Sequence, residues 1–331
     1  MIGKRTAGIG IGVALALATV AAGPTHAKDL PIEPAATTAA AFPSVMTHNL
    51  MLLPSGITDW DPDERAAIAG NSTHLRNEDI LVLTELFDDS ATDDNLFPRL
   101  RAHHPYRTPV IGRGDDGWDK TTGSYQGFPN EDGGVAILSK YPIVYRSQHI
   151  YEDGCGADFW ASKGFAYAVV NAAGKKVHVV GTHLQADDSD CDPGEAKSVR
   201  AKQLDEINAY LAALRIPASE PVIIAGDLNV NTLSSEYNAT LSRLNVAPPT
   251  LSSGMSSSFD PRTNSVARYR EPNSTPAHLD YVFLRNDHAK PAGGWTNSTK
   301  TVHSPSYTMN DHTFTDFSDH YPVVGRPTVT P

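Results

Sequence analysis

Eight short apolar runs, separated by polar stretches, limit the folds that this chain can adopt. Their length and their content of β-branched residues favour strands over helices. For such short runs a buried helical segment is the alternative, because a continuous apolar run has no period that separates the two. The predicted strands are residues 45–49, 80–85, 135–138, 165–170, 176–184, 222–226, 279–284 and 321–325.

Residues 193–214 carry the clearest helical pattern. Their apolar side chains recur on one side, which is typical of a helix that packs against a sheet. Residues 62–75 form a second candidate helix. Stretches rich in Gly, Pro, Ser and Asp at 112–134, 254–277 and 290–317 are too long for simple connections, so we predict functional loops there. We find no repeat and no domain boundary, and expect a single α/β domain with two packed sheets over residues 44–331.

The first 27 residues differ in composition from the rest. Lys4 and Arg5 precede an apolar run of small residues, and Ala27 offers a small residue at a cleavage position, which is typical of a secretory signal peptide. A membrane anchor is the alternative, but the run of about 16 residues is shorter than the ~20 that a spanning helix needs. We therefore expect cleavage after Ala27, secretion to the extracellular medium, and a loose leader over residues 28–43.

The charge balance bears on the kind of partner. The full chain carries 27 Lys and Arg residues against 38 Asp and Glu residues, a net charge of −11. Loss of Lys4 and Arg5 with the signal peptide makes this −13. An acidic surface argues against tight non-specific binding to nucleic acid, which depends on basic side chains that neutralise phosphates. Bound metal ions could still bring a phosphate ester to the chain.

The chain contains two cysteines, Cys155 and Cys191. An even pair in an exported protein suggests one disulfide, and two buried thiols are the alternative. We favour the disulfide because the expected compartment is oxidising and no cluster of metal-binding cysteines lies nearby.

Polar side chains recur at the ends of the predicted strands. Taken singly, each has an ordinary explanation as a turn residue, a helix cap, an exposed carboxylate or a structural histidine. Their repetition in one chain favours a shared site, since a strand end is a rigid place to present a ligand or a base. The residues are Asn49, Glu85, His183, Asp227, Asn229, Asp280, Asp319 and His320.

This set lacks a nucleophile but suits a metal ion. The chain has no Gly-x-Ser-x-Gly elbow and no Cys/His cluster for zinc. Carboxylates with Asn side chains suit Mg²⁺, which also takes substrate phosphate oxygens, and Mn²⁺ and Co²⁺ are alternatives because oxygen ligands suit several ions. Histidines suit proton transfer near neutral pH. The set therefore predicts metal-assisted attack of water on a phosphodiester.

Several longer strings resemble a known family. GDLN at 226–229, SDHYPV at 318–323, LDYVFL at 279–284 and the strand-end Glu85 resemble the endonuclease/exonuclease/phosphatase superfamily. THNLMLLP at 47–54, EDGGVAILSKYPI at 131–143 and GTHLQADDSDC at 181–191 resemble, more narrowly, the bacterial secreted neutral sphingomyelinases. The resemblance implies a deoxyribonuclease-like four-layer α/β sandwich and places Cys155 and Cys191 where that family has its disulfide.

The resemblance also implies roles for the strand-end residues. Glu85 would hold the central divalent ion, with Asn49 close to it, and Asp319 would support that side of the site. Asp227 and Asn229 would orient the water and the phosphoryl oxygens. The remaining implied roles are His320 as general base, Asp280 as the carboxylate that orients it, and His183 as the group that stabilises charge or protonates the leaving oxygen.

A second ion would lie at an edge site. The resemblance implies Asp89, Glu131, Asp132 and the backbone carbonyl of Phe87 as its ligands, where the family often has Asn in place of Asp89. A turn before Gly133 is the alternative explanation of Glu131 and Asp132.

The segment 292–317 departs from the family. Some members carry there a hairpin with adjacent exposed aromatics that enters the membrane, whereas here no aromatic pair stands together. We therefore expect peripheral contact with a membrane. Choline recognition would need an aromatic face. The candidates, each with ordinary packing as the alternative, are Trp118, Tyr125, Phe128, Phe159, Trp160 and Tyr269.

The expected function is a secreted, monomeric, Mg²⁺-dependent sphingomyelin phosphodiesterase of the phospholipase C type. It would convert sphingomyelin into ceramide and phosphocholine. A broader phospholipase C and an extracellular nuclease on the same fold are alternatives, and a non-catalytic lipid-binding module is a third, because a fold does not fix an activity.

Overall fold

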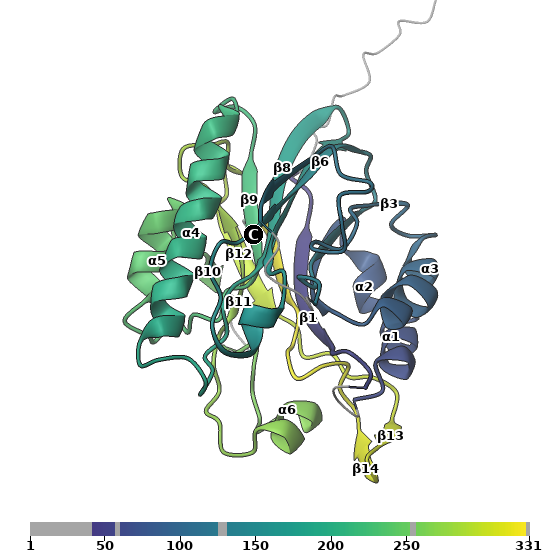
Figure 1. Cartoon of the computed structure of the whole chain (residues 1–331). Coiled ribbons are helices and arrows are strands. Elements are labelled where there is room, and N and C mark those ends of the chain that lie inside the picture. Colours follow the sequence, from purple (N-terminus) through teal and green to yellow (C-terminus); the bar gives the residue numbers. More distant parts are fainter. Residues whose placement is uncertain (1–41, 57–59, 125–130, 252–255, 329–331) are drawn as a thin grey trace, which may run out of the picture. The chain divides into compact units, whose positions relative to one another are not determined.

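The computed structural model describes residues 42–56, 60–124, 131–251 and 256–328, all within one compact unit, Ala40–Pro331 (Figure 1). The predicted signal peptide and residues 28–41 of the predicted leader lie outside the described residues, as do two candidate choline-binding aromatics, Tyr125 and Phe128. Among the described helices, none is both long enough and apolar enough to cross a bilayer.

The first sheet has seven strands in the order β10-β12-β15-β1-β2-β5-β3. Its central strands β1 and β2 are parallel, whereas β15 runs antiparallel to β1 and β5 antiparallel to β2. The sheet is therefore mixed. Its strands are β1 (Val45–Leu52), β2 (Ile80–Leu86), β3 (Tyr106–Arg107), β5 (Ala136–Ser139), β10 (Thr250–Leu251), β12 (Trp295–Thr299) and β15 (Val323–Pro327).

The second sheet has six strands in the order β11-β9-β8-β7-β6-β4. Strands β8 and β9 are parallel neighbours, and β11 runs antiparallel to β9. This sheet is mixed as well. Its strands are β4 (Lys120–Gly123), β6 (Ile143–Ile150), β7 (Gly164–Ala172), β8 (Lys175–His183), β9 (Val222–Asp227) and β11 (Asp280–Leu284).

Helices cover the outer face of each sheet (Figure 1). The first sheet carries α1 (Pro62–Gly70), α2 (His74–Asn77) and α3 (Phe97–Leu100), the last of which follows a π-helical turn, η1 (Ala91–Leu96). The second sheet carries α4 (Glu195–Leu214) and α5 (Tyr237–Leu244). Two helical layers around two packed sheets confirm the predicted four-layer α/β sandwich.

Alternate residues of one strand reach two different cores. Ile80 and Val82 of β2 pack between the sheets, together with Val179 of β8 and Ile223 of β9. Leu81 and its alternate neighbours pack under α1 and α3 instead. Because both faces of the central strands are buried, these strands are apolar without alternation. This explains why continuous apolar runs predicted them.

All eight predicted strands are present, with ends that differ by a few residues. The helix predicted at 193–214 begins at Glu195, and the candidate at 62–75 is two helices, α1 and α2. The three predicted loops were only partly correct. They contain β4, α6 (Ser265–Arg270), β12 and a hairpin of β13 (Tyr307–Met309) and β14 (His312–Phe314), whose polar sequences give no apolar run.

The predicted disulfide is present. Cys155 and Cys191 are bonded, their Cα atoms 5.3 Å apart and 36 residues apart in the sequence. The bond joins the loop after β6 to the loop that precedes α4, and residues of both segments, among them Ala157 and Asp188, line a hollow with Glu85 and His183.

Removal of this disulfide is expected to destabilise the protein. A Cys155→Ser/Cys191→Ser double variant should lose about 3–4 kcal/mol of unfolding free energy, because the reduced unfolded chain regains the entropy of an open loop. Urea unfolding of the oxidised and variant proteins measures this. An unchanged midpoint would show that the bond contributes nothing to stability.

Candidate active site

The predicted strand-end residues meet at one edge of the two sheets. Asn49 and Glu85 lie toward the carboxyl ends of the parallel strands β1 and β2, and His183 and Asp227 end the parallel strands β8 and β9. Because these sheets face each other, the four side chains converge although they are far apart in the sequence. Three of them, Glu85, His183 and Asp227, line a cleft of about 410 Å³ together with Asn229, Asp319 and His320.

Asn49 connects the two sheets beneath the cleft. Its Nδ2 donates to Glu85 Oε1 at 2.7 Å and to Asp227 Oδ2 at 3.1 Å. Its Oδ1 accepts from the backbone N–H of Met51 at 3.0 Å, which fixes which way the amide faces. Asn49 therefore holds one carboxylate from each sheet in a set position.

Backbone geometry aims two of the side chains. Glu85 and Asn229 adopt left-handed backbone conformations, with φ of 55° and 52°. Such conformations cost roughly 1 kcal/mol or more in a residue with a side chain and cluster at functional sites. Asn229 is further held by Asp227 Oδ1, which accepts from its backbone N–H at 3.0 Å, and by Leu184 O, which accepts from its Nδ2.

Gly226 permits the close approach of β8 and β9 next to Asp227. Its φ is 149°, and a Cβ atom at this position would lie 1.8 Å from the carbonyl oxygen of Thr182. No side chain fits there, so only glycine allows Asp227 to follow directly after a paired strand.

His320 and Asp280 form a buried pair. His320 Nδ1 lies 2.8 Å from Asp280 Oδ2 and 3.7 Å from Asp227 Oδ2. Burial alone would lower the pKa of His320, but the facing carboxylates of Asp280 and Asp227 outweigh it and hold that pKa well above its ordinary value. Burial and the like charge of Asp280 raise the pKa of Asp227 to about 7. The close approach of Asp227, Asp280 and His320 thus reflects a histidine with its orienting carboxylate.

His183 lies beside a cation and, like His320, close to Asp227 Oδ2. Its Nε2 is 3.4 Å from Lys163 Nζ and 3.8 Å from Asp227 Oδ2. Burial and the charge of Lys163 hold the pKa of His183 well below its ordinary value, so this ring is neutral at neutral pH. Lys163 is itself anchored by Asp158 Oδ2 at 2.7 Å.

Asp319 is paired with Arg270, a residue that the sequence did not single out. Arg270 Nη1 donates to Asp319 Oδ2 at 2.8 Å. Burial alone would raise the pKa of Asp319, but the charges of His320 and Arg270 outweigh it and hold that pKa below its ordinary value. Arg270 comes from α6, inside a predicted loop, so no periodic pattern marked it.

The residues around Glu85 fit a divalent cation. Glu85 Oε2 is buried and has no hydrogen-bond partner among the described residues, while its Oε1 is bound by Asn49. Burial, with the nearby charge of Asp319, raises the pKa of Glu85. A buried carboxylate with one unpartnered oxygen is the environment that a hard cation satisfies.

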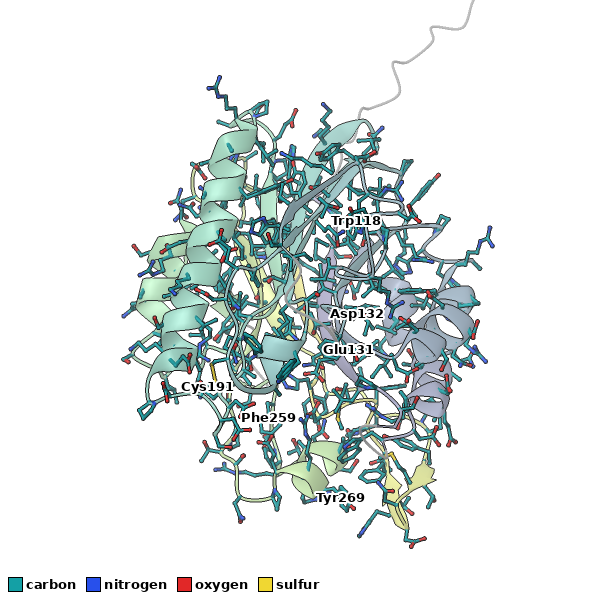
Figure 2. The ribbon with its side chains drawn as sticks, in the orientation of Figure 1. Trp118, Glu131, Asp132, Cys191, Phe259 and Tyr269 are labelled. Carbon is teal, nitrogen blue, oxygen red and sulfur yellow. A yellow bond between two sulfur atoms is a disulfide. The ribbon has the colours of Figure 1, made fainter. Side chains whose placement is uncertain are left out.

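The predicted edge site is occupied by an arginine. Arg113 Nε lies 2.7 Å from Asp89 Oδ1 and 2.5 Å from Asp132 Oδ2. Burial raises the pKa of Asp132 to about 7 despite this partner. Figure 2 shows Glu131 next to Asp132, and Glu131 and Phe87 both line a second hollow. An edge ion stays a prediction. Arg113 binds one carboxylate oxygen of Asp89 and one of Asp132, so an ion there would share these ligands with Arg113.

The hairpin that departs from the family pattern is short and packed inward. Tyr307, Met309 and Phe314 are buried in a small core with Met51 and Val266. The turn between its strands is Asn310-Asp311, both in left-handed conformations. Figure 1 shows this hairpin and α6 at the same end of the sheets. The hairpin therefore offers a polar tip and no exposed aromatic side chain.

Comparison with known proteins matches this geometry to one group of enzymes. The model of the Endonuclease/Exonuclease/phosphatase family matches residues 46–320. Sphingomyelinase C of Listeria ivanovii is 42% identical over 286 residues, which cover 85% of each chain. The solved structure of sphingomyelinase C from Streptomyces griseocarneus has a TM-score of 0.83 and 44% identity, over 86% of this chain and 99% of that one. The solved structure of a beta toxin mutant from Staphylococcus aureus with bound magnesium ions has a TM-score of 0.83 and 40% identity, and the match covers 86% of this chain and 99% of that one.

Proposed function

Because the chain belongs to the endonuclease/exonuclease/phosphatase family and, within it, to the bacterial sphingomyelinases C, we propose that it hydrolyses sphingomyelin to ceramide and phosphocholine. It is a phosphodiester hydrolase of the phospholipase C type. The observation that carries the proposal is the convergence of Glu85, Asp227, His183 and His320 on one cleft from two different sheets. Chain order alone gives no reason for these residues to meet.

We assign the cation to Glu85, with Asn49 beside it and Asp319 supporting that side of the site. A divalent ion there would supply Lewis-acid stabilisation of the phosphoryl oxygens. Mg²⁺ is the proposed ion, and Mn²⁺ and Co²⁺ suit the same oxygen ligands. Arg270 keeps Asp319 ionised, and the buried Glu85 Oε2 is the carboxylate oxygen left for the cation.

His320 is the proposed general base. Its Nδ1–H is held by Asp280, which leaves Nε2 as the atom that takes a proton from water. Asp227 and Asn229 position that water and the phosphoryl group. Oriented donors near developing negative charge lower the barrier without reorganising during the reaction.

His183 is proposed to stabilise negative charge as a neutral hydrogen-bond donor. Its lowered pKa argues against a charged imidazolium in the resting site. Lys163 supplies a fixed positive charge next to it, anchored by Asp158.

A conservative change at Asp280 tests the base assignment through pH. Asp280→Asn removes a carboxylate that raises the pKa of His320, so that pKa should fall. A base must be deprotonated to act, so the acid limb of the kcat profile should move to lower pH while the maximal rate drops. Initial rates between pH 5 and 9 measure both effects; an acid limb that stays in place contradicts the pairing.

A headgroup-release panel tests the substrate. Phosphocholine should be released from sphingomyelin in Mg²⁺, and excess EDTA should abolish this release. Phosphatidylcholine and phosphatidylethanolamine in the same panel distinguish a broader phospholipase C, and plasmid digestion distinguishes a nuclease. If the folded protein released no headgroup with any divalent ion, the proposal would be rejected.

The cellular setting belongs to the proposal as well. We propose a secreted, extracellular, monomeric enzyme with residues 1–27 as signal peptide, 28–43 as leader and 44–331 as the catalytic domain. Its relatives include bacterial sphingomyelinases C. It would meet its lipid substrate by peripheral contact with a membrane surface.

A further inference from the structure

Four exposed apolar side chains lie on segments that line the catalytic cleft or the hollow next to it. Among the described residues, seven large hydrophobic side chains are exposed. Four of them lie on three separate segments that border the cleft: Phe159, Trp160, Leu233 and Tyr269. Trp160 itself lines the hollow of about 570 Å³ that shares Glu85 and His183 with the cleft. The neighbours of Leu233 and Tyr269 along the chain line the cleft in the same way.

Phe159 and Trp160 form the largest exposed part of this rim. Their side chains are 44% and 55% exposed, and their rings meet edge to face with centroids 5.2 Å apart. They lie in a short 3₁₀ helix, η2 (Gly156–Trp160), which has no buried residue. The sequence predicted no adjacent aromatic pair in the hairpin, and the structure places one here instead. Such a pair on a soluble surface marks an interaction site.

The segment that carries the pair is held rigidly. The disulfide of Cys155 fixes the residue directly before η2. Asp188 Oδ2 accepts from the backbone N–H of Ala157 at 2.9 Å, and Asp158 Oδ2 accepts from that of Ala186 at 2.8 Å. The carbonyl of Trp160 accepts from Glu131 N at 2.8 Å. A preformed anchor loses little conformational entropy when it binds, which favours association.

We propose that Phe159 and Trp160 form the principal membrane anchor of this protein, inserting into the headgroup region of a zwitterionic bilayer so that the cleft faces the lipid. Three features favour a lipid surface. The rim is continuous with the cleft, so an inserted rim brings a lipid phosphodiester to Glu85 and His183. Trp and Phe side chains partition to the bilayer interface. Tyr269 adds a second contact on α6, at the end of the sheets where the hairpin lies (Figure 2).

The charges next to the aromatic pair also favour a zwitterionic lipid surface. Asp187, Asp188 and Asp190 lie on the loop next to η2. These carboxylates would repel an anionic membrane, so insertion of apolar side chains must supply the attraction. Binding should therefore depend little on salt, unlike binding through basic patches. The inference rests on the proposed function only for the identity of the lipid.

A double variant with a matched control tests the anchor. Phe159→Ser/Trp160→Ser is compared with Tyr106→Ser/Val144→Ser, which removes two exposed apolar side chains that line neither hollow. Both are sedimented with vesicles of sphingomyelin and phosphatidylcholine in EDTA, which stops turnover. We expect the first variant to bind about tenfold or more weakly, from the apolar area lost, and the control to bind like the parent. Raising NaCl from 0.1 to 0.5 M should change neither.

If the two double variants bound the vesicles equally well, the anchor proposal would be rejected. It would also be rejected if 0.5 M NaCl abolished binding of the parent protein to the vesicles. A second arm compares turnover of vesicles with that of a short-chain, water-soluble sphingomyelin: the vesicle-to-soluble ratio should fall about tenfold only in the Phe159/Trp160 variant. If the Phe159/Trp160 variant hydrolysed both vesicles and the soluble substrate more slowly with an unchanged ratio of the two rates, the pair would bind choline instead and the anchor would be rejected. A change in mass by light scattering would indicate a contact between two copies and also reject it. If the parent binds vesicles but hydrolyses neither lipid, the proposed function fails and the anchor stands.

Discussion

Replacing His320 by alanine is expected to lower phosphocholine release by about 10³–10⁴-fold. The variant loses the atom that takes the proton from water, while Asp280, Asp227 and Asn229 stay in place. The fold should persist, because the ring of His320 lines the cleft and belongs to none of the three large hydrophobic cores. Initial rates on sphingomyelin with saturating Mg²⁺, together with circular dichroism, measure both effects.

His303 supplies a matched control for this variant. Its Nδ1 lies 2.8 Å from Asp316 Oδ1, the same separation as in the His320–Asp280 pair, but it lines neither hollow at the site. His303→Ala should keep nearly full activity. If His320→Ala stayed within tenfold of the parent, another group would be the base and the assignment would be wrong.

The second large effect is expected at Glu85. Glu85→Gln keeps the shape of the side chain and removes its charge. Loss of a residue that only supports a metal ligand weakens metal binding by about 10–100-fold, so loss of the ligand itself should weaken Mg²⁺ binding by more than about 100-fold. Without a cation the variant should be at least as stable as the parent, because burial disfavours the ionised carboxylate. Thermal unfolding over a Mg²⁺ titration measures both, since a ligand that binds only the folded state raises Tm.

Glu131→Gln is the matched control for the cation site. Glu131 lies at the predicted edge site, where Arg113 already binds the neighbouring carboxylates, so the Mg²⁺-dependent rise in Tm should persist in this variant. A rise that vanishes in Glu131→Gln but survives in Glu85→Gln would place the dominant ion at the edge and contradict the assignment.

Much of the fold could be predicted because the central strands are buried on both faces. Residues 80–83 and 222–226 are apolar without interruption, and each run is followed by polar residues near the sheet edge, among them Glu85 and Asp227. Those two facts predicted the strands and the convergence of their ends. Strand β6 escaped prediction because Tyr145, Arg146 and Gln148 break its apolar pattern.

Two cationic side chains of the site, Lys163 and Arg270, could not be predicted from a local pattern. Lys163 precedes a strand and Arg270 lies on a short helix inside a polar stretch, so neither stands at a strand end. Their place in the site follows only from the ion pairs that the structure shows, Lys163 with Asp158 and Arg270 with Asp319. Arg113 at the edge is a similar case. Ion pairs of this kind depend on tertiary contacts between distant residues, and such contacts produce no periodic pattern in the sequence.

The most direct test of the central claim is a crystal structure with Mn²⁺, recorded for its anomalous signal. The account predicts one strong peak within coordination distance of Glu85, next to Asn49 and on the side of the cleft that holds Asp319. A peak confined to Asp89, Glu131 and Asp132, in crystals of protein that releases phosphocholine, would contradict it.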